Sequence, residues 1–180
     1  MPEAPEAPLQ RAAQRDEKVV PPSVERGVIV TLRAYVALTK PNIIWLLLIT
    51  TVPAMVVAEG GWPSSWLVMA TLVGGSLAAG GANALNQFAE RDIDAMMERT
   101  RERPLPMGIV RPRNAAIFGV ALGIVAAAWL VSTVNVLSAA LAIGALAFYA
   151  GLYTYYLKRS TVQNIVIGGA AGAVPPMIGW

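Results

Sequence analysis

Residues 71–106 read TLVGGSLAAGGANALNQFAERDIDAMMERTRERPLP, and this stretch indicates what kind of molecule the chain forms. Residues 71–89 carry no charge and are rich in Gly, Ala and Ser, the residues that let transmembrane helices pack closely. From Glu90 onward, acidic and basic side chains follow one another closely. Because ionised groups are costly inside a bilayer, the stretch predicts a packed membrane helix whose charged end emerges at the membrane surface.

The composition of the whole chain supports a membrane protein. Of its 180 residues, 56% are hydrophobic and only 14% are charged, and the mean hydropathy is +0.54. The absence of Cys and His excludes disulfides, thiolate metal sites, His metal sites and His general bases. Any metal binding or acid–base chemistry must therefore use Asp, Glu, Lys, Tyr or Asn.

Apolar segments long enough, or nearly so, to cross about 30 Å of hydrocarbon predict an all-α polytopic membrane bundle. Five spans are predicted, at about residues 41–58, 65–89, 114–132, 136–157 and 162–180. Residues 1–26, rich in Pro, Ala and both signs of charge, are typical of a disordered cytoplasmic arm. Residues 27–40 form a short amphipathic lead that we expect to lie along the membrane surface.

The basic residues predict how these spans are oriented. All fourteen Lys and Arg residues fall before the first span, between the second and third, or between the fourth and fifth. Loops 59–64 and 133–135 have none. Since cytoplasmic loops carry the excess of Lys and Arg, the N-terminus, the loop 91–113 and Lys158 are predicted to be cytoplasmic. Because these residues flank spans, the basic balance does not favour nucleic-acid binding.

The charged end of the second span carries a stripe of oxygen-bearing side chains. At about 100° per residue, Asn86, Glu90 and Asp94 fall on one helical face, which Asn83 shares. Asp92 falls near 240° on the same scale and points away. Oxygen ligands suit Mg²⁺, which keeps positions open for a phosphate partner. The spacing therefore favours a magnesium site.

Arginines follow this stripe at once. Arg99 and Arg103 are four residues apart, on one face if helical, before Pro104 and Pro106 stop any helix. Arginine binds phosphate through a planar fork of donors. The combination indicates a metal–diphosphate site at the cytoplasmic mouth of the bundle. A solvated loop with weak surface ion pairs explains the same spacing.

Two lysines near span ends admit more than one interpretation. Lys158, in LYTYYLKR, fits either a snorkelling residue beside an interfacial aromatic belt or a second phosphate contact. Lys40, in TKPN, precedes Pro41, and a role in starting the first span is enough to explain both residues.

The motifs resemble those of a known family. NQFAERDIDAMMERTRERPLP (86–106) is similar to the first Asp-rich motif of the UbiA-type intramembrane prenyltransferases. LTKPNI (38–43), YTYYLKRSTVQN (153–164) and IVIGGAAGAVPPMIGW (165–180) resemble the branch of that family that farnesylates haem. The resemblance covers residues 35–180. It implies an all-helical fold, usually of nine transmembrane helices around a central cavity.

The resemblance also implies a reaction. A Mg²⁺-dependent enzyme of the plasma (inner) membrane transfers the farnesyl group of farnesyl diphosphate to a vinyl group of haem B, giving haem O. Asn86, Glu90 and Asp94 would be the catalytic metal-binding residues, with Glu90 where many members have Asp. The residues implied in diphosphate binding are Asn83, Arg99, Arg103 and Lys158. The implied partners are the two substrates, the bilayer and a haem-handling membrane protein.

One departure from the family pattern bears on activity. Family members have a second Asp-rich motif, but no Asp or Glu follows Glu102 here. We therefore expect an N-terminal part of the enzyme, with little or no transferase activity alone. Two alternatives stay open: a UbiA-type enzyme for a quinone or other aromatic acceptor, and a non-enzymatic membrane protein such as a transporter half.

Overall fold

The computed structural model describes residues 27–157 and 164–180, and in these residues every regular element is a helix. The elements are α2 (Val28–Thr39), α3 (Pro41–Glu59), α4 (Ser65–Met96), α5 (Pro112–Thr133), α6 (Val136–Ala147), the π-helix η1 (Phe148–Leu157) and α8 (Asn164–Gly179). The prediction of an all-α bundle is confirmed. The predicted N-terminal arm (1–26) and Lys158 lie outside the described residues.

Membrane-spanning character is clear for most of the bundle. In the described part of the chain, four helices are long and apolar enough to cross a bilayer: α3, α4, α5 and the continuous segment Val136–Thr154. The fifth predicted span appears as α8, which has 16 residues and a length of about 24 Å. That is shorter than the roughly 30 Å of a bilayer core.

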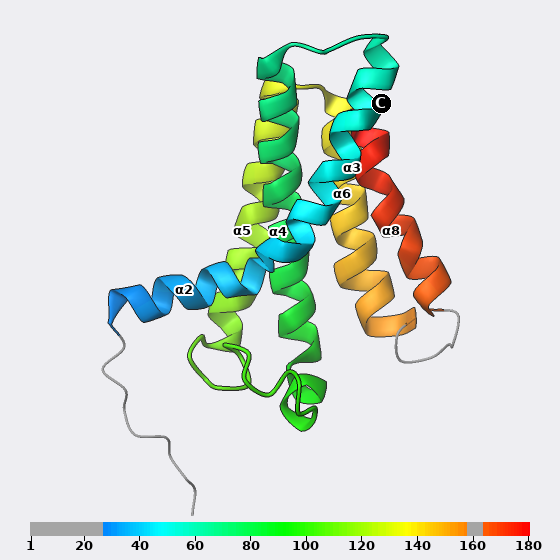
Figure 1. Ribbon diagram of the computed structural model, residues 1–180. Helices are drawn as coiled ribbons and strands as arrows, with labels where there is room; N and C mark the ends of the chain where they lie inside the picture. Colours follow the sequence, from blue (N-terminus) through cyan, green and yellow to red (C-terminus); the bar gives the residue numbers. More distant parts are fainter. Residues whose placement is uncertain (1–26, 158–163) are drawn as a thin grey trace, which may run out of the picture.

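Helix α4 is the central element. It packs against every other described helix, and most extensively against α5, which runs antiparallel beside it (Figure 1). On the other side α3, α6 and α8 pack together. The loop after α3 and the turn after α5 lie at one end of the bundle, and the loop after α4 lies at the opposite end (Figure 1). This matches the alternation of arginine-free and arginine-rich loops in the sequence.

The length of α4 carries its charged end out of the apolar zone. The helix begins at Ser65 after Ser64, whose side chain accepts a hydrogen bond from the Leu67 N–H at 3.2 Å. It has 32 residues, or about 48 Å, and ends at Met96, seven residues beyond the predicted span at Ala89. The predicted span stopped where charge begins, but the helical backbone continues.

Small residues hold α4 and α5 close together. A Cβ on Gly81 would lie 2.8 Å from the backbone oxygen of Gly119, and one on Gly119 would lie 3.0 Å from that of Gly81. Gly74 is likewise covered by the side chain of Leu130. The expectation that these glycines of α4 form a packing face is confirmed.

Gly81→Ala tests this contact. Because backbone, not a flexible side chain, faces Gly81, the helices must separate, at a cost of about 1–3 kcal/mol. We expect a lower apparent Tm in detergent by fluorescence-monitored unfolding. Gly75→Ala is the matched control in α4, since its Cβ would meet only the Leu48 side chain at 3.7 Å. Equal Tm values for the two variants would contradict the close backbone contact.

Candidate active site

The polar stripe of α4 lies on its buried face. Asn83, Asn86, Glu90 and Asp94 are each 2–5% exposed, whereas Asp92 is exposed. Helical phase therefore separates the four buried side chains from Asp92, as the spacing predicts. Buried polar groups require partners, and three neighbouring segments supply those of Asn83, Asn86 and Asp94.

The first partner is the loop that follows α4. Arg103 Nη1 donates to both carboxylate oxygens of Asp94, at 2.8 Å and 2.7 Å. Thr100 Oγ1 donates to the backbone oxygen of Asp94 at 2.9 Å. The loop therefore folds back and places one guanidinium against the end of the stripe. A charge-assisted contact of this kind is stronger than a neutral hydrogen bond.

Arg99 lies apart from this contact. The helical spacing that would place Arg99 and Arg103 on one face does not apply, because α4 ends at Met96 and the chain continues in turns. Arg99 is exposed on the loop. Of the two arginines, only Arg103 reaches the stripe.

The second partner is the junction between α2 and α3. Lys40 adopts a left-handed conformation (φ 53°, ψ 64°) that ends α2, and Pro41 begins α3. Its Nζ donates to Asn86 Oδ1 at 3.2 Å. A role at the helix start therefore describes only part of what Lys40 does, since the residue also brings an ammonium group to the stripe. Proximity of residues 40 and 86 depends on the turn at the junction, and no local pattern encodes it.

Two side-chain amides of α4 form hydrogen bonds with the C-terminal end of α2. Asn83 Nδ2 donates to the Thr39 carbonyl at 2.8 Å, and Gln87 Nε2 donates to the Leu38 carbonyl at 2.9 Å. The last carbonyls of a helix lack intrahelical donors, so these amides complete the C-terminus of α2. Asn83 therefore has a docking role, and its contact with diphosphate stays a prediction. Gln87 was not anticipated, because nothing in its local spacing marks it.

The third partner is η1. Asn86 Nδ2 donates to Thr154 Oγ1 at 3.1 Å, and Thr154 is 1% exposed. Asn86 is thus bonded at both ends of its amide, to Lys40 and to Thr154. Lys158, the other predicted phosphate contact near this segment, lies outside the described residues.

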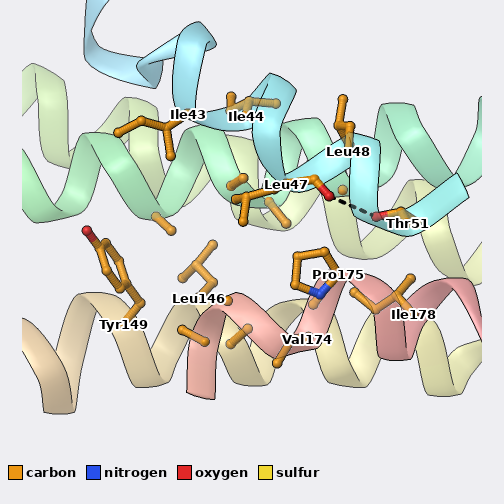
Figure 2. A pocket seen from close by; sticks show the side chains of 18 of the residues that line it. Ile43, Ile44, Leu47, Leu48, Thr51, Leu146, Tyr149, Val174, Pro175 and Ile178 are labelled. Carbon is orange, nitrogen blue, oxygen red and sulfur yellow. Dashed lines mark hydrogen bonds between the residues drawn. The ribbon is translucent and has the colours of Figure 1, made fainter. Parts of the chain in front are cut away.

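An apolar cavity of about 280 Å³ adjoins the stripe (Figure 2). Tyr149 lies at one end of the view and Ile178 at the other, with aliphatic side chains of α3, α6 and α8 between them (Figure 2). Asn83 of the stripe also lines the cavity. The polar stripe and the apolar cavity are therefore neighbouring parts of one site.

The donor set suits a hard cation. Asn86, Glu90 and Asp94 offer only oxygen ligands in a buried row, the kind that Mg²⁺ prefers. In the described part of the chain, no three acidic side chains come together. A cation held here would complete its coordination with oxygens from a phosphate ligand, from water or from elsewhere in the protein.

Comparison with known proteins identifies the class. The UbiA prenyltransferase family matches residues 47–180, and the chain belongs to this family. No solved structure matches the chain.

Three relatives show the similarity, and each is named a protoheme IX farnesyltransferase. The chain is 57% identical over 149 residues to protoheme IX farnesyltransferase 2 of Saccharopolyspora erythraea, covering 83% of this chain and 46% of that protein. It is 59% identical over 147 residues to protoheme IX farnesyltransferase of Kineococcus radiotolerans, and the match covers 82% of this chain and 43% of that protein. It is 58% identical over 149 residues to protoheme IX farnesyltransferase of Streptomyces avermitilis, and the match covers 83% of this chain and 49% of that protein. The chain spans about half the length of the curated relatives it matches.

Arg103→Met tests the contact between the loop and the stripe. The substitution leaves the buried carboxylate of Asp94 without its cation. We expect the free energy of unfolding to fall by about 1–2 kcal/mol. That is less than the 3–5 kcal/mol typical of a fully buried pair, because the Arg103 side chain is 29% exposed and partly screened. Thermal unfolding in detergent measures the effect.

Arg101→Met is the control, because Arg101 is an exposed residue of the same loop. Combining Arg103→Met with Asp94→Asn should cost less than the sum of the single changes. Strict additivity would show that the two side chains do not stabilise each other.

Proposed function

We propose that the full-length protein transfers the farnesyl group of farnesyl diphosphate to a vinyl group of haem B, giving haem O. The observation that carries this proposal is 52–59% identity, over most of the chain, to proteins named protoheme IX farnesyltransferase. The site supports it, because the stripe that carries the buried carboxylates and contacts an arginine and a lysine reaches an apolar cavity at Asn83. A diphosphate with an isoprenoid tail has the same division into a charged head and an apolar chain.

Asn86, Glu90 and Asp94 are the residues that we propose to hold Mg²⁺. Their oxygens fit the ion, and Mg²⁺ would take the positions that Arg103 occupies at Asp94 and that Lys40 occupies at Asn86. Bound Mg²⁺ would supply Lewis-acid stabilisation of the charge that develops on departing diphosphate.

Cationic side chains would also stabilise the charge on the departing diphosphate. When the bond from farnesyl C1 to oxygen breaks, the diphosphate carries the electron pair away and leaves an allylic cation. C1 of this cation would bond to the vinyl group of haem B, and water would add to the cation left on that group and release a proton, giving haem O. Arg103, with its planar fork, lies where it can bind diphosphate oxygens, and Lys40 adds a second charge. Arg99, Asn83 and Lys158 are further proposed contacts of the diphosphate.

The apolar cavity has a separate role in this proposal. Its lining from α3, α6 and α8 is almost entirely aliphatic, so the farnesyl chain enters it without losing hydrogen bonds. Exclusion of water also protects the allylic cation from hydrolysis before it meets the acceptor.

We further propose a plasma-membrane protein whose site faces the cytoplasm. The arginine-rich loop after α4 lies at the end of the bundle opposite the loop after α3 and the turn after α5 (Figure 1). An excess of Lys and Arg is typical of cytoplasmic loops. The partners proposed here are farnesyl diphosphate, haem B, the bilayer and a haem-handling membrane protein.

The reaction is tested with the purified full-length protein. We expect haem O, identified by mass spectrometry, from haem B and farnesyl diphosphate with Mg²⁺, and none after EDTA treatment until Mg²⁺ is restored. A quinone precursor offered in place of haem B should not be farnesylated. Farnesylation of that acceptor but not of haem B would assign the protein to another branch of the family.

The acidic stripe is tested by Glu90→Gln and Asp94→Asn. Each change keeps the shape of the side chain and removes a charge, so we expect the rate of haem O formation to fall at least about 100-fold. Asp92→Asn is the matched control, because Asp92 is exposed on the same turn of α4; its rate should stay within about twofold, as for most surface substitutions. Activity of the Glu90 and Asp94 variants equal to that of the control would favour a non-enzymatic role for this stripe.

A further inference from the structure

Thr154 occupies a specific place beside the acidic stripe. It lies in the π-helix η1 and is 1% exposed. Its Oγ1 donates to the Tyr149 carbonyl, five residues earlier, at 2.6 Å, and accepts from Asn86 Nδ2 at 3.1 Å. A separation of five residues is that of a π-helical turn, a feature frequent at functional sites.

The single proton of the Thr154 hydroxyl fixes the direction of these bonds. A hydroxyl has one proton to donate, and a backbone carbonyl only accepts. Since the proton goes to Tyr149, the hydroxyl meets Asn86 as an acceptor. Asn86 must then present its amino group, not its oxygen, to Thr154.

Lys40 imposes the same orientation from the other side. An ammonium group only donates, so the atom of Asn86 that lies 3.2 Å from Lys40 Nζ must be the oxygen Oδ1. Two neighbours from different helical segments therefore agree on one of the two orientations of this amide. In that orientation Oδ1 is presented to a cation, and Nδ2 is turned away from it.

We propose that Thr154 is a positioning residue that keeps Asn86 Oδ1, not Nδ2, available to a divalent cation bound with a diphosphate. The inference rests on the proposed function of the stripe and deepens it. Only Oδ1 can ligate a cation, because the amide nitrogen has no free electron pair to offer. A divalent cation that binds Oδ1 takes the place of Lys40 there, so Thr154 is then the neighbour that holds the amide. Without the acceptor at Thr154, the amide is free to turn its amino group toward that cation.

The test compares Thr154→Val, which keeps the shape but removes the hydroxyl, with Thr154→Ser, which keeps the hydroxyl. In the full-length protein, Mn²⁺ is titrated in the presence of inorganic diphosphate and followed by electron paramagnetic resonance. We expect about tenfold weaker Mn²⁺ binding for the valine variant, the lower end of the range for residues that orient metal ligands. The serine variant should bind within about twofold of wild type, as expected when the orienting group is retained.

A second background separates orientation from general damage. Asn86→Asp replaces the amide with a carboxylate, which presents oxygen whichever way it turns. Thr154→Val should therefore weaken Mn²⁺ binding much less in the Asn86→Asp protein than in wild type. An equal loss in both backgrounds would show that Thr154 supports only the local fold, and would overturn the inference.

The remaining outcomes are also decisive. Wild-type Mn²⁺ binding by a folded Thr154→Val protein overturns the inference, as does equal weakening in the serine variant. If the valine variant does not fold, Thr154→Cys replaces it, because a thiol is a weak acceptor, and the same outcomes apply. Failure of the wild-type protein to form haem O overturns the proposed reaction alone if the wild type still binds Mn²⁺ with diphosphate.

Discussion

Buried amides and carboxylates on α4 need hydrogen-bond partners, because an apolar bundle offers no water to replace them. The partners come from three places: the end of α2 through Lys40, the loop after α4 through Arg103, and η1 through Thr154. Each contact joins one of these segments to α4, in addition to its apolar packing. The polar stripe therefore organises the surrounding bundle as well as the proposed chemistry.

The two sides of α4 pack differently against their neighbours. Toward α5, glycines bring the backbones of the two helices into contact, as Gly81 and Gly119 show. Toward α3, α6 and α8, the same helix leaves an apolar cavity that begins beside Asn83 and Tyr149 (Figure 2). Close packing on one side gives the stripe a rigid support, and the cavity on the other has room for the isoprenoid chain of the proposed substrate.

Sequence patterns predicted the helices and the buried face of α4 well, because both depend on local periodicity. Asn86, Glu90 and Asp94 share a face and Asp92 does not, since helical phase alone decides this. The patterns did not predict the position of Arg99. The prediction assumed a helix through Arg99 and Arg103, but α4 ends at Met96. Lys40, Gln87 and Thr154 were also missed as neighbours of the stripe. Lys40 and Thr154 meet the stripe, and Gln87 beside it meets the end of α2, through contacts between segments far apart in the chain.

The sequence by itself determined a membrane bundle with one charged helix end, because hydropathy, helical period and the placement of arginine are local properties. Its motifs also marked it as a UbiA-type chain. Only the tertiary structure decided which groups meet: Arg103 meets the carboxylate of Asp94, Lys40 meets the amide oxygen of Asn86, and Thr154 meets its amino group. The reason is geometric. A hydrogen bond requires its donor and acceptor atoms to lie within about 3 Å of each other. Lys40 and Thr154 are separated from Asn86 by 46 and 68 positions in the sequence, so only the packing of whole helices sets that distance.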